Sequence, residues 1–161
     1  MDHVDHVLEQ WAAERPDLDV SPMAVIGRLG SAAARVDARL DATFARYGID
    51  GGVFDVLATL TRQGKPYRIT PAQLADEAMI TSSAVAQRLN RLVTLGLVRR
   101  LPNPDDRRST LVELTPAGAD LVARVLPDHL ATEEGLLGGL TADERSTLAA
   151  LLARVAEPTA T

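Results

Sequence analysis

Polar and basic side chains that can bind nucleic acid gather between residues 82 and 108 of the sequence. A helix is expected over about 82–96, and at about 100° per residue its apolar residues Val85, Leu89 and Leu92 share one face. The outer side carries no acid and can hydrogen-bond to base edges or phosphates through Ser82, Ser83, Gln87, Asn90 and Arg91. The spacing predicts a helix that packs with one face and reads duplex DNA with the other.

A charged turn follows this helix. Residues 97–101 and 110–114 predict two short strands of a β-hairpin, and the turn between them holds Asp106, Arg107 and Arg108. An arginine at a hairpin tip can enter the minor groove, and Asp106 could orient Arg108 through a charge-assisted hydrogen bond. Each feature taken alone could be an ordinary solvated surface. Helix, tight turn, helix and basic hairpin in this order favour DNA binding.

Residues for enzyme chemistry are scarce. The three histidines are His3, His6 and His129, and no nucleophile elbow, phosphate loop or metal-ligand spacing is found in the sequence. His3 and His6 could share a helix face and bind a metal, but a solvated pair near the chain end is the simpler interpretation. We therefore expect no enzyme, no cofactor and no metal. The lack of cysteine, signal peptide and membrane-length apolar segment predicts a cytoplasmic protein.

Charge is distributed unevenly along the chain. The net charge is −5, which is unusual for a DNA-binding protein, but residues 62–110 carry nine basic and four acidic residues. This segment therefore has a net charge of +5, against −10 for the rest of the chain. A basic middle inside an acidic frame supports a localised contact with a polyanion.

The remaining elements must position this segment. Periodicity and capping residues predict further helices over about 3–15, 21–47, 52–62, 71–78 and 116–128, and a last helix that opens with the capping box Thr141–Glu144. The predicted fold is mainly α with a small β-hairpin wing, a winged helix-turn-helix. The expected parts of one compact domain are N-terminal helices (1–48), a DNA-binding lobe (49–114) and C-terminal helices (115–161).

The two end regions predict a homodimer. The second helix has an apolar stripe about five turns long, and the last helix has another stripe formed by Leu148, Leu151, Leu152 and Val155. A single small lobe cannot cover both stripes, so we expect a two-fold partner to bury them.

Several motifs resemble the MarR family of transcriptional regulators. They are Asp106-Arg107-Arg108, the string 114–118 (Leu-Thr-Pro-Ala-Gly), the string 54–57 (Phe-Asp-Val-Leu) and the run 95–100 (Leu-Gly-Leu-Val-Arg-Arg). The resemblance covers nearly the whole chain. It implies a dimer built from N- and C-terminal helices, two DNA-reading lobes, and a wing pair formed by Asp106 and Arg108.

A finer resemblance is to the urate-responsive branch of that family, which is PecS- and HucR-like. An extra N-terminal helix with Trp11, followed by Arg-Pro-Asp-Leu-Asp at 15–19, is similar to that branch. The branch implies ligand-linked residues at Trp11, Asp55, Arg88 and Arg100. Alternatives remain for three of them: core packing for Trp11, local capping or pairing for Asp55, and a phosphate contact for Arg100. The chain has Ala86-Gln87 where the branch implies Thr-Asn.

These observations predict a ligand-responsive transcriptional repressor. It would bind a palindromic operator in double-stranded DNA as a homodimer and be released by a small organic anion such as urate. Two alternatives stay open: a MarR-type regulator with another ligand, such as a phenolic compound, and a winged helix used only for protein contacts.

Overall fold

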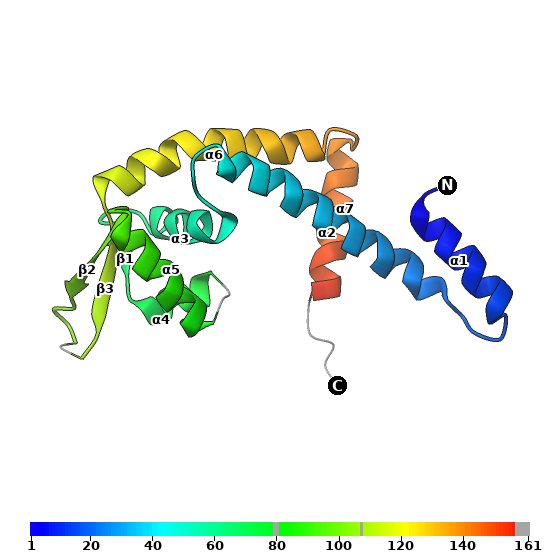
Figure 1. Ribbon diagram of the computed structural model, residues 1–161, viewed down its shortest axis with the longest axis horizontal. Coiled ribbons are helices and arrows are strands. Elements are labelled where there is room, and N and C mark those ends of the chain that lie inside the picture. Colours follow the sequence, from blue (N-terminus) through cyan, green and yellow to red (C-terminus); the bar gives the residue numbers. More distant parts are fainter. Residues whose placement is uncertain (79–80, 107, 157–161) are drawn as a thin grey trace. The chain divides into compact units, whose positions relative to one another are not determined.

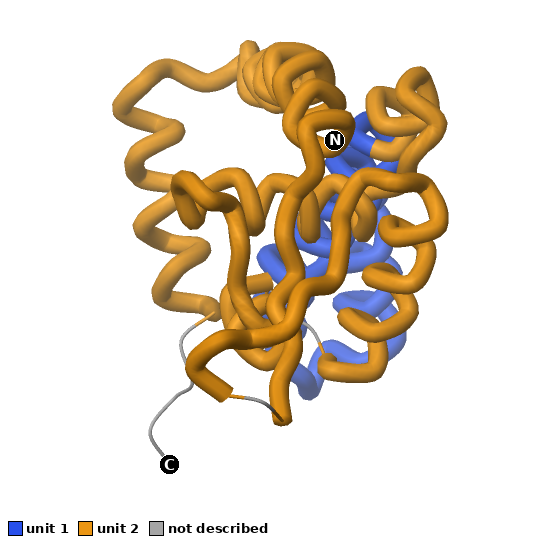
Figure 2. Tube along the Cα trace, turned by 90° about the vertical axis from the view of Figure 1, so that its left-hand side faces the viewer, with its two compact units in different colours: residues 1–40 blue, residues 41–161 orange. Residues whose placement is uncertain are grey.

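The computed structural model describes residues 1–78, 81–106 and 108–156. Two compact units divide the chain, and we call residues 1–40 the N-terminal unit and residues 41–161 the main unit (Figure 2). Within the described ranges, none of the helices combines the length and apolar character needed to cross a lipid bilayer.

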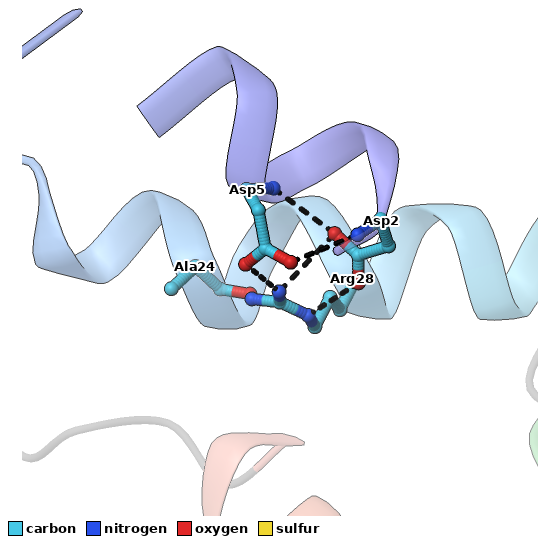
Figure 3. A network of polar contacts seen from close by, with 4 residues as sticks. All are labelled: Asp2, Asp5, Ala24 and Arg28. Atoms are coloured by element: carbon cyan, nitrogen blue, oxygen red, sulfur yellow. Dashed lines mark hydrogen bonds and ion pairs between the residues drawn. The ribbon is translucent and has the colours of Figure 1, made fainter. Parts of the chain in front are cut away.

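The N-terminal unit pairs helix α1 (His3–Glu14) with most of helix α2 (Ser21–Ala45). Asp2 caps α1 in a reciprocal capping box with Asp5. The Arg28 guanidinium of α2 then binds both carboxylates, with Nε 2.8 Å from Asp2 and Nη2 2.5 Å from Asp5 (Figure 3). Val4 fits over Gly27, where a Cβ would meet its methyl groups at 3.3 Å. The Arg28 ion pairs and the close approach of Val4 to Gly27 thus hold α1 on α2.

The core of the main unit surrounds helix α3 (Gly51–Arg62), which packs on helix α6 (Pro116–Leu136) (Figure 1). Five of its apolar side chains are buried: Val53, Phe54, Val56, Leu57 and Leu60. Helices α4 (Pro71–Glu77) and α5 (Ser82–Thr94) pack on each other and on α3. Thr70 forms the expected capping box with Gln73 at the start of α4. The short link between these helices includes residues 79–80, which lie outside the described residues.

A three-stranded antiparallel sheet replaces the expected two-stranded hairpin. Its order is β1 (Arg68–Ile69), β3 (Thr110–Leu114), β2 (Val98–Pro102). Strands β2 and β3 form the wing, and Val98 pairs with Leu114. Strand β1 was missed because two residues are too few to show an alternating pattern.

Helix α6 continues to Leu136, beyond the end expected near residue 128, although Pro127 lies inside it. An interior proline removes a backbone hydrogen bond and favours a break. Contacts with the end of α2 support the turns around and beyond it: the Thr43 and Thr132 hydroxyls lie 2.8 Å apart, and the Tyr47 hydroxyl donates to Asp128 at 2.7 Å. Tertiary contacts therefore override the local signal.

Helix α7 (Ala142–Ala156) begins with the predicted Thr141–Glu144 capping box and buries none of its residues. Its apolar side chains Leu148, Leu151, Leu152 and Val155 are 39–57% exposed. The predicted stripe is therefore present and has no cover within this chain's described residues.

Substitution of Gly118 tests the contact between α6 and the wing. A Cβ at Gly118 would lie 2.7 Å from Leu114 Cδ1 and closer still to the Leu97 carbonyl oxygen. We expect Gly118→Ala to destabilise the protein by about 1–3 kcal/mol, because the methyl group overpacks a backbone contact. In the same helix, a Cβ at Gly135 meets nothing within 4 Å. Gly135→Ala should therefore gain up to about 1 kcal/mol from helix propensity. Urea unfolding compares them, and equal midpoints would contradict this packing.

Candidate nucleic-acid interface and adjoining charge site

Helix α5 presents two chemically different faces, as its sequence predicts. Val85, Leu89 and Leu92 are at most 1% exposed. Ser82, Ser83, Gln87, Asn90 and Arg91 are exposed on the rest of the helix. The Thr81 hydroxyl caps α5 by accepting from the Ala84 N–H at 3.3 Å, and it lies 3.0 Å from the Ser83 hydroxyl. The buried stripe therefore leaves the polar face open to solvent.

Arg100 lies beside α5 on strand β2. Its Nη2 donates to the Asn90 side-chain oxygen at 2.9 Å. This contact joins the wing to the polar face of α5, and it takes Arg100 to a partner that the sequence did not predict. Both side chains remain exposed, so Arg100 adds its guanidinium to the polar surface formed by α5.

Arg91 binds Asp50, the N-cap of α3. Asp50 uses one carboxylate oxygen to accept from the Val53 N–H at 2.8 Å and the other to accept from Arg91. An acid at a helix N-terminus also complements the helix dipole. In the free protein, an arginine expected to contact DNA is thus held by a carboxylate.

Arg88 extends from α5 to the first turn of α3. Its Nη1 lies 3.8 Å from Asp55 Oδ2. A Cβ at Gly52 would lie 2.7 Å from Arg88 Nε and 2.8 Å from Cζ, so the guanidinium rests directly on the glycine backbone. Nη1 is buried and finds no hydrogen-bond acceptor in the described part of the chain. The structure therefore brings Arg88 and Asp55 together, as the predicted ligand set requires.

The environment of Asp55 raises the pKa of its carboxyl. Although 59% of its side chain is exposed, burial of the remainder raises the pKa of its carboxyl above the ordinary value, while the charges of Arg88 and His129 act in the opposite direction. His129 stacks in a cluster with Phe44 and Phe54, 4.7 Å from the Phe54 ring. The site thus combines an arginine with a partly desolvated carboxyl, and the aromatic cluster belongs to the buried core of the main unit.

The wing turn holds Asp106 and Arg108 in a way that differs from the expectation. Asp106 Oδ1 accepts from the backbone N–H of Arg108 at 2.9 Å, and the Asp106 carbonyl accepts from the Ser109 N–H at 3.0 Å. Asp106 therefore shapes the backbone of the turn, while the Arg108 side chain is exposed. Arg107 lies outside the described residues.

Trp11 belongs to α1 in the N-terminal unit and is 40% exposed. Asp55, Arg88 and Arg100 belong to the main unit. Of the predicted ligand set, the structure brings only Asp55 and Arg88 within ion-pair distance. No group of three or more potential metal-ligating side chains is found within the described ranges.

Glu113 was not predicted to matter, and it holds two arginines of the basic segment. Its carboxylate is buried on the sheet, pairs with Arg68 at 2.5 Å and accepts from Arg99 Nε at 2.8 Å. The three residues lie side by side on β1, β3 and β2. Only the strand register makes this cluster visible, so sequence spacing could not reveal it.

Two more residues were missed at the start of α3. Asp50 precedes a glycine pair and an apolar helix, which is a detectable N-cap signal. Its pairing with Arg91, 41 residues away, has no sequence signal. Gly52 likewise shows its role only through the guanidinium that lies on it.

The pairing of Arg88 with Asp55 leads to a prediction about the pKa of the Asp55 carboxyl. Arg88→Met should raise the pKa of Asp55 further, because the positive charge that stabilises the carboxylate is removed. Since the folded-state pKa is the raised one, the contribution of Asp55 to folding is present below its unfolded pKa and is lost as pH rises through the folded pKa. That loss should grow in the variant. NMR titration of the carboxyl measures the shift, with Asp17 as an internal control, and an unchanged Asp55 would contradict the pairing.

Known proteins share both the sequence and this architecture. A MarR family profile matches residues 47–109. The HTH-type transcriptional regulator PecS of Dickeya dadantii (strain 3937) is 43% identical over 152 residues, which cover 94% of this chain and 92% of PecS.

Two solved structures extend the comparison. A cysteine-to-serine variant of Escherichia coli MarR complexed with operator DNA has a TM-score of 0.77 and 31% identity, over 87% of this chain and 100% of that one. Bordetella bronchiseptica BpsR, whose DNA binding is regulated by 6-hydroxynicotinic acid, has a TM-score of 0.76 and 28% identity, over 83% and 94%. The mainly helical winged-helix fold is thereby confirmed, and the chain belongs to the MarR family.

Proposed function

We propose that this protein is a DNA-binding transcriptional regulator whose operator affinity is set by a small organic anion. The observation that carries the proposal is helix α5, which buries an apolar stripe and exposes an acid-free polar face beside the wing. A related chain, E. coli MarR, was solved with its operator DNA. Regulation by repression is part of the proposal, since an anion that releases DNA would restore transcription.

Helix α5 is the proposed reader of the major groove. Ser82 and Ser83 lie in its first turn, where hydroxyls and backbone N–H groups suit phosphates. Gln87 and Asn90 are side chains that can pair with adenine edges, and Arg91 with guanine or phosphate. The wing residues Asp106, Arg107 and Arg108 complete the proposed interface, with Asp106 shaping the turn and Arg108 entering the minor groove.

Duplex binding should depend steeply on salt. With roughly 6–10 phosphate contacts, affinity should fall about 10³–10⁵-fold between 50 and 200 mM salt. Arg108→Ala should weaken binding to all duplexes, because a minor-groove arginine reads width and charge. Gln87→Ala should instead relax preference at particular base pairs, each worth about 1–3 kcal/mol.

Selection from a random duplex pool, followed by fluorescence anisotropy, measures these effects. Arg46→Ala is the matched control, since it removes one exposed arginine in the turn after α2, where it pairs with Asp128 of α6. No duplex binding by the unaltered protein would refute the DNA-binding proposal. Equal losses in Arg108→Ala and Arg46→Ala would remove the wing from the interface.

We also propose a homodimer joined through the ends of the chain. Besides α7, helix α2 exposes Met23, Val25, Ile26, Leu29 and Val36, each 36–61% exposed. Apolar stripes of this length on two helices suit a self-complementary interface.

The dimer proposal predicts that charge on α7 separates the subunits. Leu151→Glu combined with Leu152→Glu should give monomers or insoluble protein, because two charges would be buried in the interface. Glutamates at Ser146 and Ala150, exposed on the other side of α7, are the control. Light scattering after size exclusion measures the mass, and a folded, duplex-binding monomer from the first variant would contradict the proposal.

The proposed effector site surrounds Arg88 and Asp55. An anion there could accept from the buried Arg88 Nη1 and from N–H groups at the start of α3, which favour negative charge. Urate is the proposed anion because the N-terminal helix with Trp11 and the string 15–19 resemble the urate-responsive branch. Trp11 and Arg100 remain proposed members on sequence grounds. BpsR supports the ligand class, because its DNA binding is regulated by a heteroaromatic acid.

Urate should therefore release DNA, loosening the complex about 5- to 150-fold if the coupling is of ordinary size. The anion must favour the DNA-free form, since equal affinity for both forms shifts nothing. Titration with urate follows operator release by anisotropy and binding by fluorescence of Trp11, the only indole. Arg88→Met should lose the response. A urate response that persists there would exclude Arg88 from the site, and no response to urate in the unaltered protein would refute urate as the effector.

A further inference from the structure

Gly52 lies in the first turn of α3, directly beneath the guanidinium of Arg88 from α5. A Cβ at this position would approach Nε at 2.7 Å, Cζ at 2.8 Å and Nη2 at 3.0 Å. Real Cβ atoms essentially never come this close, so any other residue would push the guanidinium away. Its backbone is helical, so a positive φ does not explain the glycine.

We propose that Gly52 is a positioning residue: its missing side chain forms the seat that keeps Arg88 on α3 and thereby holds the DNA-reading helix in its binding position. This inference rests on the proposed function and adds the element through which the effector site and α5 are coupled. Gly52 need not touch DNA or ligand itself.

The charges around Gly52 explain why Arg88 needs a position without a side chain. A guanidinium at the start of a helix meets the positive end of the helix dipole, which is unfavourable by itself. Asp55 offers a partner at 3.8 Å, and Asp50 caps the same turn. The arginine can approach Asp55 in this way only if it lies close against the backbone of the turn, which the glycine allows. Loss of the seat would thus release Arg88 without removing any charge.

An alanine at this position would imitate the effector. An anion that takes Arg88 from Asp55 and an alanine at Gly52 would both remove the Arg88 contact that links α5 to α3. Gly52→Ala should therefore weaken duplex binding in the absence of any ligand, and the added effect of urate should shrink accordingly. The three atoms nearest to the new methyl group belong to the end of one flexible side chain, Arg88, so the fold should persist.

The neighbouring glycine supplies a matched control. A Cβ at Gly51 would meet only the Phe44 ring at 3.5 and 3.7 Å and Asp41 at 4.0 Å, which are ordinary contacts. Gly51→Ala makes the same chemical change one residue earlier in the same helix turn. Any general effect of alanine on the start of α3 will be common to both variants.

The experiment compares the unaltered protein, Gly51→Ala, Gly52→Ala, Arg88→Met and the double variant Gly52→Ala/Arg88→Met. Duplex affinity is measured by anisotropy without urate, and the carboxyl of Asp55 is titrated by NMR. We expect Gly52→Ala to weaken binding roughly 5-fold or more, as for a typical allosteric coupling, and to shift the Asp55 titration upward. In the Arg88→Met background the same alanine should change affinity by less than about twofold, the limit of additivity.

Three results would overturn the inference. Gly52→Ala could match Gly51→Ala in affinity and in the Asp55 titration, its effect could persist in the Arg88→Met background, or it could unfold the protein whether or not Arg88 is present.

Failure of the proposed function would give a different set of results. Without duplex binding by the unaltered protein, the Asp55 titration and the same cycle measured by unfolding still decide whether Gly52 seats Arg88. If duplex binds but urate does not, urate is excluded as the effector, and the affinity cycle measured without urate still decides the role of Gly52.

Discussion

The attachment of α5 to the first turn of α3 is the interaction on which the rest of the structure depends. Two arginines one helical turn apart, Arg88 and Arg91, pair with Asp55 and Asp50. Exposed ion pairs contribute little stability, about 0–1 kcal/mol each. Burial of Val85, Leu89 and Leu92 holds the helix in the domain, and the two arginine contacts attach it to α3 at two further points. In our proposal, this second constraint orients the helix for the groove.

The sequence predicted the helices well because caps and apolar stripes are local signals. Thr70 and Thr141 open helices as expected, and the buried face of α5 agrees with its periodicity. The prediction failed where contacts between residues distant in the sequence determine the structure. Helix α6 passes through Pro127 because Thr132 and Asp128 are held by the end of α2, and β1 exists only because β3 offers it an edge.

The candidate site was predicted in composition more than in geometry. Asp55 and Arg88 do meet, but Arg100 binds Asn90, and Asp106 binds the backbone of residue 108 and shapes the turn. The count of charges along 62–110 also overstated the free positive charge. Acids from outside that segment fold onto its arginines, and pairing across strands or helices cannot be counted from spacing.

The carboxylate of Asp50 has a consequence for how binding is measured. If Arg91 leaves Asp50 for a phosphate, the phosphate releases a cation while the newly unpaired carboxylate attracts one. The two changes partly cancel, although salt dependence is normally taken to count neutralised phosphates. The number of phosphates deduced from such a slope would then fall below the number contacted. In the proposed complex, Asp50 would thus act as an intramolecular counterion and make binding less sensitive to ionic strength than the number of phosphate contacts alone implies.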